Sequence, residues 1–449
     1  MNAQAVDSFA PLAPEKGRGA SLPQVRVLVL TRAVPVHGSG GMEVNSLELA
    51  RQLARRGCAV TILTTGHPES PSETRWEEAE TVQIGYIGSG PSGAYSPSWA
   101  ARSLEIATRL DCAAGFDLVH AHNSAGVALA RAVHFRDRPL VVSWHGHHAA
   151  WIASALRDQR RKDGWLPAVS YAIQVGLRLV RQDSRYSRAA DAVIAQDAVA
   201  AHQIRLQRLA NRKTLQVIPI GVNAERFSPA GDGADAVVRA RHEIPPDAPL
   251  LLAVGRLVPE KGFDDLLRAI PAVLAARPDA RLLVLGVGED EDRLRASIRR
   301  LTITGAASLG GAVHHAELPA YFRAADVVVV PTRHGGGVNT VLLEAMACGR
   351  PVVATAVAGV AAIVESDRSA LLVRAGSPAG LSGAILSLLF DPLRRRCLGE
   401  AARARIEAGF DWASLAARTH ALYIRLVGAA SVRRSGVPPK TPGFRSEVS

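Results

Sequence analysis

The chain has 449 residues, of which 48% are hydrophobic and 21% are charged. This composition is typical of a globular protein of about two or three domains, and it excludes wholesale disorder and a collagen-like repeat. The formal net charge of +12 favours anionic partners, such as nucleotide phosphates, anionic lipid or nucleic acid, without choosing among them.

The ends of the chain and its cysteines indicate where the protein resides. Residues 1–24 and 428–449 are rich in proline and glycine and predict disordered tails, and the first of them carries no apolar signal segment. The cysteines form no C-x-x-C pair, which predicts reduced thiols in the cytoplasm rather than disulfides or a zinc site. They are Cys58, Cys112, Cys348 and Cys397.

Short apolar segments alternate with amphipathic helical segments along the body of the chain. The predicted strands are 25–30, 59–64, 118–120, 140–143, 192–195, 215–219, 250–254, 281–285, 327–330, 352–355 and 371–373. This order predicts an α/β protein with parallel sheets wound with helices, whose strands are buried on both faces. In such folds ligands bind beyond the carboxyl ends of the strands.

Residues 223–249 are rich in proline, glycine and aspartate and show little periodicity, so we place an inter-domain linker there. The chain then divides into two Rossmann-like, doubly wound domains, 25–222 and 250–411, that face each other across a cleft. Residues 157–188 are basic, with aromatic residues in or near them. They fit either a helix lying on an anionic membrane or, as we prefer, a solvated helix face.

Two segments of the first domain could carry chemistry. Gly40 and Gly41 belong to a glycine turn before a helical segment, which suits an anion site but also an ordinary loop, since the G-x-G-x-x-G spacing is absent. His145 follows a strand and could donate a hydrogen bond to an oxygen of a sugar or phosphate. His147 and His148 could add a metal site, but carboxylates and cysteines are missing nearby.

The second domain has a strand-to-helix turn with two cations, Arg256 and Lys261, after Gly255. Two cations that converge on such a turn suit a diphosphate, whose charge must be neutralised as it leaves. The alternative is two solvated cations on a loop.

A further glycine turn, 335–337, precedes a helical segment that contains Glu344. The backbone amides of 338–340 could bind a phosphate. A carboxylate inside an apolar helix needs hydrogen-bond donors. A ribose diol could supply them, and so could an internal arginine or a backbone amide.

As an ordered set these segments resemble the retaining GT-B glycosyltransferases of family 4, from about residue 25 to about residue 426. The motifs are Gly40-Gly41-Met42-Glu43, residues 116–122, Ser143-Trp144-His145-Gly146, residues 217–223 with Arg226-Phe227, residues 255–262, and Glu344-Ala345-Met346-Ala347-Cys348-Gly349-Arg350-Pro351. The resemblance implies an acceptor domain at 25–222, a nucleotide-sugar donor domain at 250–411, and a helix at 412–427 that packs back on the first domain.

The resemblance also implies roles for the residues of the site. Arg256 and Lys261 would hold the donor diphosphate, Glu344 the ribose, and His145 the transferred sugar. The other donor-binding residues would be Gly40, Gly41, Gly255, Gly286, Gly337, Val338, Asn339 and Thr340. Transfer would retain the anomeric configuration. It would need no metal or cofactor, because positive side chains and helix dipoles do the work of a divalent ion, and no enzymic nucleophile, because the leaving phosphate assists deprotonation of the acceptor hydroxyl.

The chain departs from the family pattern at four positions. The first of the family's two glutamates falls at Gly336, and other common residues are replaced at Asn223, Ala362 and Ala370. Because Arg256, Lys261 and Glu344 are all present, we expect an active transferase acting on a glycan, lipid-linked or small-molecule acceptor in glycan or polysaccharide biosynthesis, in the cytoplasm or at the inner face of the membrane. The alternatives are a degenerate member that binds nucleotide sugar without turnover, a sugar-nucleotide epimerase and, as the weakest, a nucleic-acid binder, for which no motif is present.

Overall fold

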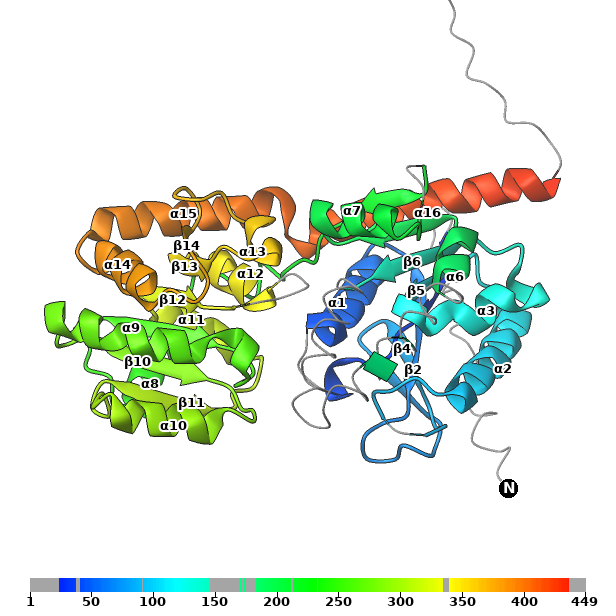
Figure 1. The fold of residues 1–449 in the computed structure, drawn as a ribbon. Helices are drawn as coiled ribbons and strands as arrows, with labels where there is room; N and C mark the ends of the chain where they lie inside the picture. Colours follow the sequence, from blue (N-terminus) through cyan, green and yellow to red (C-terminus); the bar gives the residue numbers. More distant parts are fainter. Residues whose placement is uncertain are drawn as a thin grey trace, which may run out of the picture.

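The computed structural model describes residues 24–37, 41–90, 92–145, 169–170, 173, 183–210, 213–231, 233–333 and 339–435. Two sheets, each with helices around it, form two domains that lie side by side (Figure 1). The predicted α/β class is confirmed.

The first domain contains an eight-stranded sheet with the order β3-β4-β2-β1-β5-β6-β7-β8. Neighbouring strands are parallel except β3 and β4, which are antiparallel. The strands are β1 (Arg26–Leu30), β2 (Ala59–Thr65), β3 (Arg75–Ala79), β4 (Val82–Ile87), β5 (Leu118–His122), β6 (Leu140–Trp144), β7 (Ala192–Ala195) and β8 (Leu215–Val217). The helices are α1 (Gly41–Arg55), α2 (Pro97–Ala114), α3 (Val127–Arg131), α6 (Ser184–Ala189) and α7 (Ala198–Leu206).

The second domain contains a six-stranded parallel sheet with the order β11-β10-β9-β12-β13-β14. Its strands are β9 (Leu250–Val254), β10 (Arg281–Leu285), β11 (Ala307–Gly311), β12 (Val327–Val330), β13 (Val352–Thr355) and β14 (Leu371–Val373). Its helices are α8 (Ala234–Arg241), α9 (Phe263–Ala276), α10 (Glu291–Arg300), α11 (Leu318–Ala324), α12 (Thr340–Ala347), α13 (Ala358–Ala361), α14 (Pro378–Leu389) and α15 (Pro392–Gly409).

The central strands are apolar on both faces because helices cover both sides of each sheet. Along β1, Val27 and Val29 join one hydrophobic cluster while Leu28 and Leu30 join another. Burial on both faces explains why continuous apolar segments predicted these strands correctly.

The last helix, α16 (Trp412–Ser435), leaves the second domain and lies along the first (Figure 1). Backbone hydrogen bonds join Val222 to Phe410 (2.9 Å) and Trp412 to Val222 (3.1 Å), so the two chain crossings between the domains are side by side. The helix continues to Ser435, which corrects the prediction that a tail begins at residue 428. Among the described residues, no helix combines the length and the apolar character that a bilayer crossing requires.

The predicted linker 223–249 differs from an extended connection, because it contains α8. This helix packs on α11, and Arg239 pairs with Asp326 at 2.9 Å, which ties the segment to the second domain. The basic segment 157–188 lies almost entirely outside the described residues.

Candidate active site

The ends of β9 and β10 approach each other at two glycines, Gly255 and Gly286. Their φ angles are 153° and 135°, which favour glycine. A Cβ atom on Gly286 would lie 1.9 Å from the carbonyl oxygen of Gly255. These predicted donor-site glycines therefore lie together at the carboxyl edge of the sheet, where the backbone leaves no room for a side chain.

The two predicted phosphate-binding cations follow Gly255. Arg256 is exposed, whereas Lys261 is partly buried at the end of a short 3₁₀ turn (Pro259–Lys261). Burial and the nearby charge of Arg256 lower the pKa of Lys261, and Glu260 offsets part of this shift. Within the described ranges, neither cation forms an ion pair with a carboxylate. The two neighbouring cations outnumber the one carboxylate that acts on Lys261, that of Glu260, and this excess of positive charge makes the turn suitable for an anion.

Glu344 lies inside α12 and is only 6% exposed. Its Oε1 accepts a hydrogen bond from Nε2 of His315 at 2.8 Å. The sequence suggested a ribose, an arginine or a backbone amide as the partner, and the structure supplies a histidine from the loop before α11 instead. One oxygen of Glu344 is thereby fixed in orientation.

A cavity at the domain boundary brings Glu344 and Thr340 opposite helix α1. Its polar lining residues include Asn45, Glu48, Arg226, His315, Thr340 and Glu344. At the start of α12, Nδ2 of Asn339 donates to Oγ1 of Thr332 at 3.3 Å. Residues of both domains therefore line one cavity, whose walls are mainly apolar with a few polar groups.

His145 follows β6 and packs against His122 of β5, with ring centroids 4.8 Å apart and an interplanar angle of 22°. Its Nε2 lies 2.5 Å from Nδ1 of His122. Its Nδ1 contacts the side-chain amides of Asn45 (3.4 Å) and Gln196. Burial and the neighbouring His122 hold the pKa of His145 well below its ordinary value, so the ring is neutral at pH 7.

Both ring nitrogens of His145 thus have protein partners, and hydrogen bonding to a sugar would require one of them to be exchanged. Asn45 contacts His145 and also lines the cavity that contains Glu344. The turn of Arg256 and Lys261 lies beside the loop after β12, because the backbone amide of Arg333 donates to the carbonyl of Glu260 at 2.8 Å.

Several predicted residues are not placed. Gly40, Gly337 and Val338 lie outside the described residues, as do Gly336, His147 and His148, and of Gly41 only its position as the first residue of α1 is described. In the part of the chain that the structure describes, no group of three or more His, Cys, Asp or Glu side chains is arranged to hold a metal.

Sequence reasoning missed His315, Asn45 and Gln196. His315 lies in a polar loop without periodicity, so no sequence signal distinguished it. The position of His122 could have been predicted. It lies two residues after His120 in a strand, so the two side chains must lie on the same face of the sheet.

The paired parallel α/β domains, with helices of both at a shared cavity, define the GT-B class, and comparisons identify the family. The family model described as Glycosyltransferase Family 4 matches residues 39–226, and that described as Glycosyl transferases group 1 matches residues 236–405. The chain therefore belongs to the family 4 (group 1) glycosyltransferases, as its motifs indicated.

Relatives among characterised proteins share this family. The D-inositol 3-phosphate glycosyltransferase of Kineococcus radiotolerans is 31% identical over 427 residues, which cover 89% of this chain and 94% of that protein. The GDP-mannose-dependent monoacylated alpha-(1-6)-phosphatidylinositol monomannoside mannosyltransferase of Corynebacterium glutamicum is 31% identical over 283 residues, which cover 61% and 66%.

Solved structures confirm the GT-B fold. Sucrose-phosphate synthase from Thermosynechococcus elongatus superimposes with a TM-score of 0.73 at 25% identity, over 90% of this chain and 100% of that one. Anabaena Alr3699/HepE in complex with UDP and glucose gives 0.66 at 18% identity, over 89% and 99%, and this likeness concerns the fold alone.

Proposed function

We propose that the protein transfers a sugar from a nucleotide-diphosphate sugar to an acceptor hydroxyl, with retention of the anomeric configuration. The observation that carries this proposal is the pair of cations, Arg256 and Lys261, at the carboxyl end of β9, for which the described residues supply no ion pair with a carboxylate. The relative from Corynebacterium glutamicum is GDP-mannose-dependent according to its name, which supports a nucleotide-sugar donor.

In the proposed mechanism the donor diphosphate lies against the turn after β9. As the bond between the anomeric carbon and the phosphate oxygen breaks, negative charge develops on that oxygen, and Arg256 and Lys261 neutralise it. Glu344, oriented by His315, accepts hydrogen bonds from the ribose hydroxyls. The leaving phosphate takes the proton of the acceptor hydroxyl, which attacks from the same face.

The names of the relatives suggest the chemistry of the acceptor. One acts on D-inositol 3-phosphate and another on a phosphatidylinositol mannoside, according to those names. We propose a polyol or glycan hydroxyl, free or lipid-linked, as the acceptor class. A lipid-linked acceptor would place the enzyme at the cytoplasmic face of a membrane.

A second candidate function is nucleotide-sugar binding without turnover. Its basis is Gly336, which stands where the family has the first of two glutamates. That change removes a carboxylate from the donor site and leaves Arg256, Lys261 and Glu344 in place.

Nucleotide release from UDP-, GDP- and ADP-sugars, with and without acceptors, tests the proposal. The Arg256→Ala variant should lose about 1.5–3 kcal/mol of transition-state stabilisation, roughly a 10- to 150-fold decrease in kcat/KM. The matched control is Arg295→Ala, which removes an exposed arginine that pairs with Glu291 on α10. Turnover of Arg256→Ala within a few-fold of the wild type would refute the diphosphate assignment, and nucleotide binding without any turnover would favour the second candidate.

A further inference from the structure

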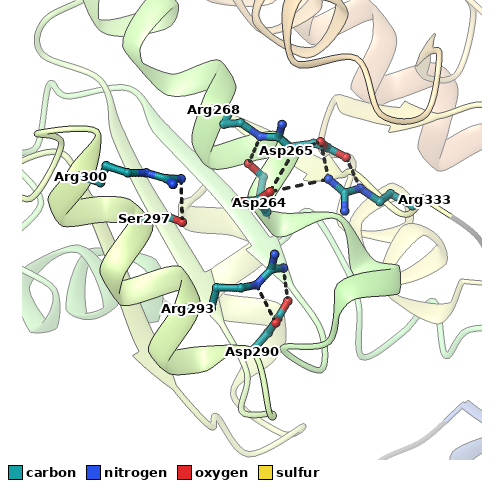
Figure 2. Close-up of polar contacts among 8 residues, drawn as sticks. All are labelled: Asp264, Asp265, Arg268, Asp290, Arg293, Ser297, Arg300 and Arg333. Atoms are coloured by element: carbon teal, nitrogen blue, oxygen red, sulfur yellow. Dashed lines mark hydrogen bonds and ion pairs between the residues drawn. The ribbon is translucent and has the colours of Figure 1, made fainter. Parts of the chain in front are cut away.

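A cluster of four charged side chains lies at the start of α9, beside the proposed diphosphate site (Figure 2). Arg333, from the loop after β12, forms a two-pronged contact with Asp265: Nε to Oδ2 at 2.5 Å and the terminal nitrogen to Oδ1 at 2.6 Å. Arg268 donates to Asp264 at 2.9 Å and to Asp265 at 2.7 Å. The two carboxylates and two guanidinium groups sum to zero charge.

The contact between Asp265 and Arg333 joins the start of α9, just after the turn of Lys261, to the loop after β12. Asp265 lies four residues after Lys261, and Arg333 directly precedes the segment that contains the glycine run 335–337. The backbone of Arg333 also donates to Glu260, and a Cβ atom on Gly262 would lie 2.0 Å from the carbonyl oxygen of Pro331. The two loops are therefore fixed to each other by side-chain and backbone contacts.

Burial makes this contact energetically important. The side chain of Asp265 is 3% exposed, against 26% for Arg333. The hydrogen bond to Asp265 is the main cause that raises the pKa of Arg333. Removal of Arg333 leaves Asp265 with Arg268, and removal of Asp265 leaves Arg333 with a longer contact of 3.7 Å to Asp264. In either case the two-pronged contact between the two segments is lost, and the segments are free to shift.

We infer that Asp265 and Arg333 are positioning residues that hold residues 331–333, after β12, against the turn of Lys261, so that Lys261 meets the donor diphosphate in the correct position. This inference rests on the proposed function. Neither residue needs to touch the nucleotide. Both act through the turn that carries Lys261.

The alternative is that Arg333 leaves Asp265 and contacts the phosphates itself. The direction in which Asp265→Asn changes nucleotide affinity distinguishes a positioning role from direct contact with the phosphates. Asp265→Asn removes a negative charge beside an anion site, so electrostatics alone would tighten nucleotide binding, and a released Arg333 would tighten it further. A positioning role predicts the opposite, because the loop loses its anchor.

The experiment is calorimetric titration of the full-length chain with UDP, GDP and ADP, with the melting temperature of each variant recorded. Asp265→Asn, Arg333→Gln and the double variant are compared with the wild type for the nucleotide that it binds best. We expect each single variant to raise Kd about tenfold and the double variant to be no worse than the weaker single variant, because the residues act as one unit. In steady-state assays the donor KM should rise more than kcat falls.

Asp279→Asn is the matched control, since Asp279 forms a two-pronged pair with Arg277 at the other end of α9. Its Kd should stay within about twofold of the wild type, as expected for a surface pair outside the site. If Arg333→Gln fails to fold, Arg333→Lys replaces it. It retains the charge but not the two-pronged geometry, and positioning still predicts weaker binding.

Unchanged or tighter binding by Asp265→Asn, together with weaker binding by Arg333→Gln, would overturn the inference in favour of direct contact. Wild-type binding in both variants would also overturn it and leave the proposed function intact. A wild-type chain that binds none of the nucleotides would instead refute the proposed donor site, and the positioning role with it.

Discussion

Glu344 shows how a single carboxylate is prepared for ligand binding inside an apolar helix. Its burial is offset by the hydrogen bond from His315. We expect Glu344→Ala to decrease kcat/KM roughly 10- to 150-fold, because a charge-assisted contact of about 1.5–3 kcal/mol is lost. Glu317→Ala is the control, since Glu317, just before α11, forms an exposed ion pair with Arg241 of α8. Equal losses in the two variants would show that Glu344 does not bind the donor.

The histidines His120, His122 and His145 form a continuous stack, with neighbouring ring centroids 4.8 Å apart. His120 contacts the hydroxyl groups of Tyr423 at 2.6 Å and Ser143 at 2.7 Å. Burial lowers the pKa of all three rings, and that of His122 falls to about 4 from an ordinary 6.5. The stack is therefore neutral in the folded protein at pH 7.

This shift predicts that stability falls on acidification. Above pH 6.5 His122 is neutral in both the folded and the unfolded chain, so its titration does not lower the free energy of unfolding there. Between pH 6.5 and about 4 the unfolded chain takes up a proton that the folded chain does not, and the free energy of unfolding drops by about 3 kcal/mol in total. Melting temperatures across this range measure the slope.

The His122→Asn variant should give a shallower pH dependence than the wild type over the same range. His202→Asn, which changes an exposed histidine of α7, should retain the wild-type slope. If the melting temperature of His122→Asn falls with pH as steeply as that of the wild type, the loss of stability in acid arises from groups other than His122.

Among the elements, the apolar character of the sequence decided which strands could be predicted. All the predicted strands are present, most of them as apolar runs, whereas β3, β4 and β11 were missed. Strand β4 is buried, but Gln83 and Gly85 interrupt its apolar run. Strand β3 (Arg-Trp-Glu-Glu-Ala) is an edge strand with two glutamates, and β11 ends in two glycines at the other sheet's edge. Edge strands need no apolar run on both faces, so their sequences carry a weaker signal.

Some residues of the candidate site could likewise be predicted from the sequence, and others could not. Residues beside glycine turns at strand ends, such as Arg256 and Glu344, could be singled out because the chain geometry places such turns at the ligand-binding edge. Partners that approach from distant loops could not. His315 meets Glu344, and Asp265 meets Arg333 across 68 residues, only after the sheet has assembled.

The close approach of β9 and β10 predicts a strong effect at Gly286. A side chain there meets the carbonyl oxygen of Gly255 and a φ of 135°, so Gly286→Ala should destabilise the second domain by about 3 kcal/mol or more. Gly383→Ala is the control, since nothing lies within 4 Å of that position within α14 and alanine favours helix. Urea titration of both variants measures the difference, and equal midpoints would contradict the proposed backbone contact.

At the scale of the whole molecule, the last helix links the stability of the domains. Helix α16 follows the second domain in sequence but packs on α1 of the first. Arg56 donates to the carbonyl of Ala413 at 2.9 Å, and Arg418 to that of Val217 at 2.6 Å. The first domain therefore completes its core only when the C-terminal helix has been synthesised.

Tyr423 tests this dependence, because its side chain is fully buried and its hydroxyl meets His120 of β5. Tyr423→Ala should lower the free energy of unfolding by about 3–5 kcal/mol through the cavity that it leaves. Hydrogen exchange should show the loss in β1 and β5, while β9 and β12 keep their protection. Arg433→Ala is the control, since it removes only an exposed pair with Asp191. Equal loss of protection in both sheets would show that the two domains unfold as one unit, and that α16 stabilises the molecule as a whole rather than the first domain.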